Sequence, residues 1–302
     1  MLILAKSILG LMIGFFMAVI LGWFLIPMLR KLKCKQTISV FTAFRHACKE
    51  GTPTLGGLIF IIPTIVTMII LFFRGSLEIT NSLLIIIFVF VSYASLGFVD
   101  DYLKIRDHSN DGLSINQKLF AQVVIALIFF YIYMKGGGDA NVTITSLNLS
   151  INMGWFYGLF ILFLLVGSSN AVNLTDGLDG LAGSLSLVAF LSFGIITWGS
   201  SWIEGYQEIA IFCFILVGGI LGFLVYNTHP AKVFMGDTGS LALGATLAAI
   251  AILTKHELSL ALIGGVFVIE VLSSIIQIIA INKFKRKVFL MTPLHHHFEK
   301  LG

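Results

Sequence analysis

Charged side chains are scarce in this 302-residue chain: only 11% of its residues are charged, whereas 58% are hydrophobic. An ordinary soluble domain is about 25% charged and about 45–50% apolar. So little charge cannot cover a water-facing surface, and so much apolar mass exceeds the needs of one core. This excludes a soluble two-domain enzyme and a disordered chain, and it favours an all-α integral membrane protein, a polytopic bundle of helices.

Cysteine is also scarce, since the chain has only Cys34, Cys48 and Cys213. Three scattered residues exclude a disulfide framework and a CxxC metal site. The net charge of +4 is typical of cytoplasmic anchoring of membrane helices and gives no ground for nucleic-acid binding. The sequence lacks a Gly-x-x-x-x-Gly-Lys loop and a Gly-x-Ser-x-Gly elbow, which excludes P-loop and α/β-hydrolase sites.

Long apolar runs, in contrast, are abundant. A helix needs about 20 apolar residues to cross a bilayer, and lipid tolerates only helices or closed barrels. Continuous apolar runs favour helices over alternating strands. No repeat or low-complexity linker divides the chain, so we expect one membrane domain over residues 1–302. The nine predicted spans are 8–28, 55–73, 83–99, 119–134, 155–169, 181–197, 209–226, 241–254 and 258–281.

The distribution of positive charge predicts the orientation of these spans. With the connection 30–54 placed in the cytoplasm, 15 of the 19 Lys and Arg residues lie on that side. The remaining four are Lys6, Arg74, Lys135 and Lys255. Because basic residues concentrate in cytoplasmic loops, we expect the N-terminus outside and the C-terminus inside.

Five cytoplasmic connections carry the distinctive polar residues. Aspartates gathered at one membrane face repel each other without a counter-ion. Hard oxygen ligands without cysteine suit Mg²⁺ or Mn²⁺ better than zinc, and Mg²⁺ is commonly shared with substrate phosphates. The sequence therefore predicts phosphoryl chemistry at the cytoplasmic surface. The five motifs are 51–57 (GTPTLGG), 100–104 (DDYLK), 170–180 (NAVNLTDGLDG), 234–240 (FMGDTGS) and 293–299 (PLHHHFE).

Each motif also has a purely structural interpretation. Two adjacent aspartates can form a solvated helix end, Asp-Gly pairs are common in turns, and Thr and Ser in the fourth motif can cap a helix. The three histidines could be an expression scar or zinc ligands, although zinc-ligand spacing is missing. Glu270 and Gln277 lie seven residues apart on one helix face, where they could simply bond to neighbouring helices.

Together and in this order, the five motifs resemble those of the polyprenyl-phosphate N-acetylhexosamine-1-phosphate transferases. The triple histidine favours the branch that uses phospho-N-acetylmuramoyl-pentapeptide over the branch that uses GlcNAc-phosphate. The resemblance covers essentially the whole chain. The family usually has ten transmembrane helices, the last of them after the histidine motif, whereas the sequence given ends at Gly302.

The resemblance implies the transfer of phospho-N-acetylmuramoyl-pentapeptide from UDP-N-acetylmuramoyl-pentapeptide to undecaprenyl phosphate, which gives lipid I and UMP in peptidoglycan synthesis. It implies an Mg²⁺ cofactor, a multi-pass location in the bacterial inner membrane with its lipid bilayer, and a cytoplasmic catalytic face; a homodimer stays open. Two alternatives remain, a UDP-GlcNAc:polyprenyl-phosphate GlcNAc-1-phosphate transferase and a membrane transporter.

The resemblance also implies roles for individual residues. The expected catalytic residues are Asp100, Asp101, Asp237 and His295. Asp237 is the expected main Mg²⁺ ligand, with Asp100, Asp101 and Asp176 as further candidates. Asp100 could accept a proton or act through the metal, and a covalent aspartyl intermediate stays open. The expected substrate-binding residues are Lys49, Thr54, Asn173, Asp176, Leu178, Asp179, Asn227, Phe234, Gly236, Ser240, His296 and His297.

Overall fold

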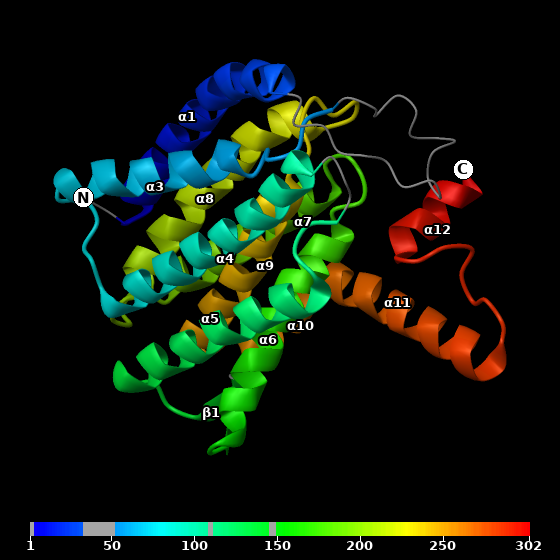
Figure 1. The fold of residues 1–302 in the computed structure, drawn as a ribbon. Helices are drawn as coiled ribbons and strands as arrows, with labels where there is room; N and C mark the ends of the chain where they lie inside the picture. Colours follow the sequence, from blue (N-terminus) through cyan, green and yellow to red (C-terminus); the bar gives the residue numbers. More distant parts are fainter. Residues whose placement is uncertain (1–2, 33–51, 108–110, 145–148) are drawn as a thin grey trace.

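The computed structural model describes residues 3–32, 52–107, 111–144 and 149–302. In these residues the chain forms eleven helices and one two-stranded antiparallel sheet (Figure 1). Eight helices are long and apolar enough to cross a membrane, which confirms the predicted polytopic helix bundle. They are α1 (Ile3–Lys31), α4 (Asn81–Arg106), α5 (Ile115–Lys135), α6 (Phe156–Thr175), α7 (Leu181–Gly199), α8 (Tyr206–Asn227), α9 (Gly236–Leu253) and α11 (Gly265–Phe284).

Helices α8 and α9 form the centre of the bundle. Of their apolar stretches, 78% and 83% are buried, against 17–44% in the other long helices. A helix that is apolar on all sides is buried by its neighbours. Small residues let those neighbours approach closely: a Cβ added to Gly218 of α8 would lie 2.1 Å from the Leu11 carbonyl oxygen of α1. Without such residues α1 could not pack at this distance.

The last predicted span, 258–281, is wrong as a single helix. The structure divides it into the seven-residue α10 (Glu257–Ile263) and α11, which meet at Gly264. Two consecutive glycines weaken a helix at this point, and glycine pairs are common sites of kinks. Figure 1 shows that α11 then runs outward from the bundle, and that the short α12 (Leu294–Leu301) lies on the same side.

The predicted span 55–73 is also shorter than expected. Helix α3 (Leu58–Phe73) has 16 residues, because residues 53–57 pair with another segment, as described below. A β-hairpin that the sequence did not predict joins α5 to α6; its strands are β1 (Asn141–Ile144) and β2 (Leu149–Asn152).

The bundle therefore has two polar ends. At one end α4, α6 and α8 finish and α5, α7 and α9 begin, and the polar motifs lie there; we call it the motif end. At the other end lie the β-hairpin and the start of α10, and we call it the hairpin end.

Candidate active site

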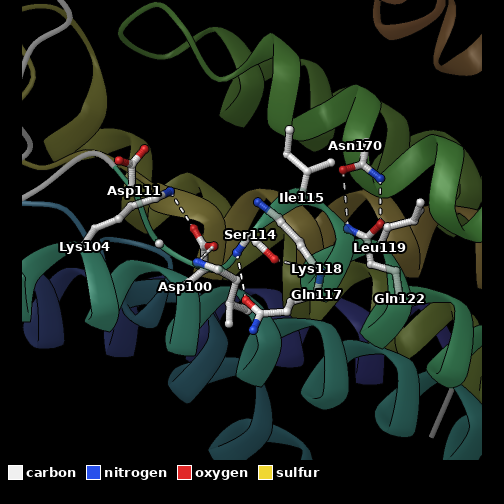
Figure 2. Close-up of a pocket in the computed structure, with 12 residues that line it drawn as sticks. Asp100, Lys104, Asp111, Ser114, Ile115, Gln117, Lys118, Leu119, Gln122 and Asn170 are labelled. Atoms are coloured by element: carbon white, nitrogen blue, oxygen red, sulfur yellow. Dashed lines mark hydrogen bonds and ion pairs between the residues drawn. The ribbon is translucent and has the colours of Figure 1, made fainter.

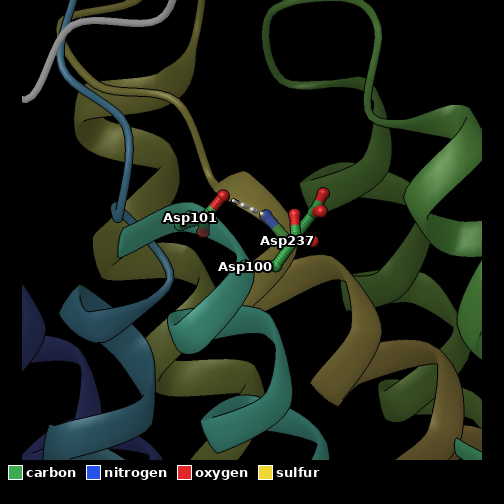
Figure 3. A group of neighbouring side chains, drawn as sticks. All are labelled: Asp100, Asp101 and Asp237. Carbon is green, nitrogen blue, oxygen red and sulfur yellow. Dashed lines mark hydrogen bonds between the residues drawn. The ribbon is translucent and has the colours of Figure 1, made fainter. Parts of the chain in front are cut away.

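Three aspartates meet where the end of α4 reaches the start of α9 (Figure 3). Asp100 and Asp101 lie on α4, and Asp237 lies in the first turn of α9. One carboxylate oxygen from each lies within 4.8 Å of the others. Gly97, one turn earlier on α4, makes this approach possible, because a Cβ there would lie 2.1 Å from the Asp237 carbonyl oxygen. The two helices thus bring together acids that are more than 130 residues apart.

Asp101 holds the first turn of α9. Its Oδ1 accepts a hydrogen bond from the Asp237 backbone N–H (3.2 Å), and its Oδ2 accepts from the Thr238 N–H (2.9 Å) and hydroxyl (2.7 Å). A carboxylate at a helix N-terminus satisfies unpaired N–H groups and complements the helix dipole. The cap of α9 therefore comes from α4, not from Thr238 or Ser240 as the structural interpretation of the motif suggested.

Asp100 and Asp237 are paired with two lysines. The Lys104 ammonium lies 2.6 Å from Asp100 Oδ2 and 2.8 Å from Asp237 Oδ2, and the Lys118 ammonium lies 2.7 Å from the same Asp237 oxygen. Asp100 Oδ1 accepts from the Leu113 N–H at 2.9 Å. Asp100 is only 2% exposed, and a charge buried this deeply needs such partners.

A pocket of about 880 Å³ opens beside these ion pairs (Figure 2). Asp100, Lys104 and Lys118 line it, together with the segment that leads into α5. Across it, Gln122 of α5 and Asn170 of α6 exchange hydrogen bonds of 3.4 and 2.8 Å between their amides. The pocket therefore presents two ammonium groups, which suit phosphate oxygens, beside the carboxylates of Asp100 and Asp111.

Gly236 lets the chain turn tightly into the site. Its φ is +75°, a left-handed conformation that favours glycine. A Cβ there would lie 2.5 Å from Asp101 Oδ2 and 2.7 Å from the Thr54 hydroxyl, so Thr54 borders the aspartates. Asn173 of α6 completes this side, because its amide donates to Asp237 Oδ1 (2.6 Å) and to the Ser240 hydroxyl (2.8 Å).

Phe234 lies on a segment that pairs with the residues before α3. Its N–H donates to the Pro53 carbonyl, and its own carbonyl accepts from the Gly56 N–H, both at 2.8 Å. Backbone hydrogen bonds thus join the first motif, which precedes α3, to the fourth motif, which leads into α9. This pairing fixes Phe234 next to the aspartate cluster.

The loop between α6 and α7 lies against the loop that precedes α9. Asn227 joins them, because its Oδ1 accepts from the Gly180 N–H (3.0 Å) and its Nδ2 donates to the Val233 carbonyl (2.9 Å). Asp179 Oδ2 accepts from the Ala231 N–H at 3.2 Å. Both residues therefore hold the rim of the site through their side chains.

Asp176 and Leu178 lie half-buried in the same loop. Burial, with the nearby carboxylates of Asp237 and Asp101, raises the pKa of Asp176 to about 7. A cation that binds near this carboxyl group would lower its pKa again and favour its ionised form.

The histidine motif, which begins α12 near the C-terminus, lies against the same loop. A Cβ added to Gly177 would lie 2.3 Å from His295 Nε2, so the imidazole packs against bare backbone. Burial and the neighbouring His296 lower the pKa of His295, which favours its neutral form. In contrast, the imidazole of His296 pairs with Glu299, and the imidazole of His297 accepts from the Leu290 N–H, both within their own segment.

The predicted residues thus fall into three groups. The first group forms or borders the cluster of three aspartates: Asp100, Asp101, Asp237, Asn173, Gly236, Ser240 and Thr54. At its rim lie Asp176, Leu178, Asp179, Asn227, Phe234 and His295, while His296 and His297 hold their own segment. Lys49 lies outside the described residues.

The sequence predicted no role for three residues of the site: Lys104, the last residue of the second motif, and Lys118 and Gln122, which lie outside the motifs. Lys104 lies four residues after Asp100, hence on the same helix face, and this spacing was a usable signal. Lys118 stands at the edge of an apolar run, where a basic residue is ordinary anchoring. Gln122 offered no signal, because a single amide in a helix is commonplace.

The three carboxylates fit a divalent metal ion. They offer hard oxygen atoms from two helices within reach of each other, which is the donor set that Mg²⁺ prefers. Among the described residues, these three aspartates are the one group of His, Cys, Asp or Glu side chains whose ligand atoms lie this close together. The lysines at 2.7 and 2.8 Å from Asp237 Oδ2 already occupy the region where a cation is favoured, so a metal ion would share this oxygen with them or displace them.

Comparison with known proteins gives one consistent result. The family model described as glycosyl transferase family 4 matches residues 82–255. The chain is 47% identical to a phospho-N-acetylmuramoyl-pentapeptide-transferase of Bacillus licheniformis, and the match covers 97% of this chain and 89% of that protein. A protein of the same name from Bacillus subtilis (strain 168) is 47% identical over the same shares. One from Oceanobacillus iheyensis is 46% identical over 99% of this chain and 91% of that protein.

Proposed function

This chain belongs to the phospho-N-acetylmuramoyl-pentapeptide transferases of glycosyl transferase family 4, and from that premise we propose the reaction that it catalyses. It transfers phospho-N-acetylmuramoyl-pentapeptide from UDP-N-acetylmuramoyl-pentapeptide to undecaprenyl phosphate, which yields lipid I and releases UMP. The observation that carries this proposal is the cluster of Asp100, Asp101 and Asp237 with two lysines at the mouth of a pocket.

We propose Asp237 as the main Mg²⁺ ligand and Asp100 as a second ligand. The ion, when bound, withdraws negative charge from the UDP diphosphate and stabilises the departing UMP. Asp101 supports this indirectly, because it holds the first turn of α9 and so orients the Asp237 carboxylate.

The main obstacle to the reaction is the approach of one anion to another. The lipid phosphate is largely dianionic near pH 7, because its second pKa is about 6. Lys104 and Lys118 offset the negative charge of the two substrates in the pocket. Asp100, which faces the same pocket, accepts the proton that remains on a minor fraction of the lipid phosphate.

Asp100→Asn tests this role. A loss of rate that shrinks at high pH fits a base, because the lipid phosphate then loses its proton unaided. A loss that is equal at all pH values overturns it. Trapping of a sugar phosphate on the protein, with the lipid acceptor withheld, would instead support a two-step covalent route.

We propose that the motif end faces the cytoplasm of a bacterial cell, in the inner membrane. The sequence assigns 15 of the 19 basic residues to the connections of this side, and nucleotide donors are cytoplasmic. A cysteine introduced at exposed Ile115, beside the pocket, should resist a membrane-impermeant thiol reagent in intact cells and react in inverted membranes. Labelling in intact cells would reverse the orientation. A homodimer stays a prediction.

The decisive assay follows release of UMP and formation of labelled lipid by the purified protein. Transfer should need the UDP-linked N-acetylmuramoyl-pentapeptide, undecaprenyl phosphate and Mg²⁺, and it should stop with a chelator and return when Mg²⁺ is restored. Transfer with UDP-GlcNAc at an equal or higher kcat/KM would overturn the proposed donor. Unchanged turnover in the chelator would overturn the metal assignment.

A further inference from the structure

A glutamate lies inside the apolar helix α11, and its partner explains its place there. Glu270 is 4% exposed. Its Oε2 accepts a hydrogen bond from the His295 backbone N–H (3.2 Å) and lies 3.1 Å from His295 Nδ1. A buried carboxylate in a membrane helix is costly unless it is paired, and here both of its contacts go to one residue of the histidine motif.

The other two histidines have different arrangements. His296 Nδ1 lies 2.9 Å from Glu299 Oε2 on its own short helix, and His297 Nδ1 accepts from the Leu290 N–H at 3.1 Å. Of the three, His295 is therefore the one tied to a long helix of the bundle. Gln277, two turns after Glu270, reinforces the tie by binding the backbone of residues 288 and 289.

The second nitrogen of His295 lies against the loop between α6 and α7, at the rim of the site. Nε2 is buried and, among the described residues, has no hydrogen-bond partner. It abuts Gly177, in the loop that carries Asp176 and Asp179. An ionised carboxylate can only accept, so the contact with Glu270 places the imidazole proton on Nδ1 and leaves a lone pair on Nε2. A buried acceptor without a donor needs an explanation, and a role in binding or catalysis is one.

We propose that Glu270 is a positioning residue that fixes His295 in the Nδ1–H tautomer. The Nε2 atom then accepts a hydrogen bond from an O–H or N–H group on the sugar of the nucleotide-linked donor. This assignment of the donor's sugar rests on the proposed function, whereas the tautomer does not. No proton is transferred in this step, since the imidazole only orients and binds.

Two substitutions separate fixing of the tautomer from stabilisation of a charge. Gln at position 270 keeps an acceptor oxygen for Nδ1–H and removes the charge, whereas Met keeps the volume and removes the acceptor. We expect Glu270→Gln to retain at least about a third of wild-type kcat/KM. Glu270→Met should lose about tenfold to 100-fold, mainly through a higher KM for the nucleotide donor. Glu299→Met is the matched control at the neighbouring histidine and should change kcat/KM less than threefold.

The tautomer can be read without turnover. In ¹⁵N-histidine spectra, with His295 assigned through His295→Gln, the wild type should show a protonated Nδ1 and an unprotonated Nε2, as should Glu270→Gln. Glu270→Met should shift toward the Nε2–H form. UDP-N-acetylmuramoyl-pentapeptide should shift the Nε2 resonance of the wild type.

The outcomes separate the inference from the function. A protonated Nε2 in the active wild type would overturn the inference and leave the proposed reaction intact. Equal losses in Glu270→Gln and Glu270→Met would also overturn it, because charge would then be the essential property. An inactive wild type that still has the Nδ1–H tautomer would instead count against the proposed reaction. A folded Glu270→Met, judged by its thermal unfolding, is required for each comparison.

Discussion

The two ends of the bundle use similar groups in different ways. At the motif end, Lys104 and Lys118 pair with aspartates beside an 880 Å³ pocket. At the hairpin end, Lys255 pairs with Asp139 and donates to the hydroxyls of Tyr133 (2.6 Å) and Tyr157 (3.4 Å). The first group borders open space that a substrate can fill, and the second is occupied by its own chain. A lysine paired with acids can therefore bind a substrate only where the surrounding chain leaves a pocket beside it.

The hairpin end is a closed network. The Lys255 ammonium lies 5.3 and 5.1 Å from the ring centres of Tyr133 and Tyr157, within the range of cation–π attraction. The Tyr157 hydroxyl donates to Glu257 Oε1 at 2.6 Å. Burial raises the pKa of Glu257, which is 2% exposed. The network joins α5, α6, α10 and the β-hairpin, so we interpret it as structural.

The largest expected difference between the two ends comes from removing one carboxylate at each. Asp237→Asn should lower the transfer rate by at least about 10²–10³-fold, because it weakens the proposed metal ligand and the pairing of two lysines. Asp139→Asn, the same change at the hairpin end, should leave turnover within about twofold. Initial rates of UMP release, per unit of folded protein, measure both. Similar rates for the two variants would break the comparison.

Replacing one lysine at each end by methionine should separate an effect on activity from an effect on stability. Lys118→Met should lower kcat by about 10²-fold, with a thermal unfolding temperature close to that of the wild type. Lys255→Met should do the opposite, because it breaks the network of the hairpin end while kcat stays near the wild-type value. Turnover assays and unfolding in detergent check this. A large loss of kcat in Lys255→Met would mean that the hairpin end takes part in function.

Removing one hydroxyl from the hairpin end should have a smaller effect. Tyr157→Phe leaves the buried Glu257 carboxylate without the donor at 2.6 Å. A buried acceptor without its partner costs about 1–3 kcal/mol. Chemical denaturation should show this loss, and Tyr131→Phe, an exposed tyrosine on α5, is the control that should show none. Equal stability of the two variants would contradict the structural interpretation.

The smallest effect should appear on acidification. Burial opposes ionisation of Asp139, but the Lys255 ammonium outweighs it and lowers the pKa of this carboxyl. The resulting stability is present above the ordinary Asp pKa of about 3.9 and is lost as the pH falls through the lowered value. Because Asp139 is more than half exposed, the contribution should stay below about 1 kcal/mol. Unfolding temperatures of the wild type and Asp139→Asn should converge as the pH falls below about 4, and a constant difference would contradict this.

The sequence predicted the membrane class and most spans because hydropathy depends on local composition. It also predicted that the polar motifs converge, because spans that cross the membrane in alternating directions place every second connection, beginning with the first, at the same face. It could not predict the division at Gly264 or the α9 cap from Asp101, since both depend on how distant segments pack. For the same reason, it could not predict that Glu270 binds His295 and that Gln277 binds the backbone of Phe289.

The glycine at position 97 has a practical consequence for genetics. The Asp237 carboxylate has its position because α4 offers bare backbone at this point, so an added methyl group would displace the start of α9 and this carboxylate with it. Gly97→Ala alters no charge and no polar atom. A screen that covers only chemically reactive side chains would overlook this substitution, although it should lower the transfer rate about as much as Asp237→Asn does.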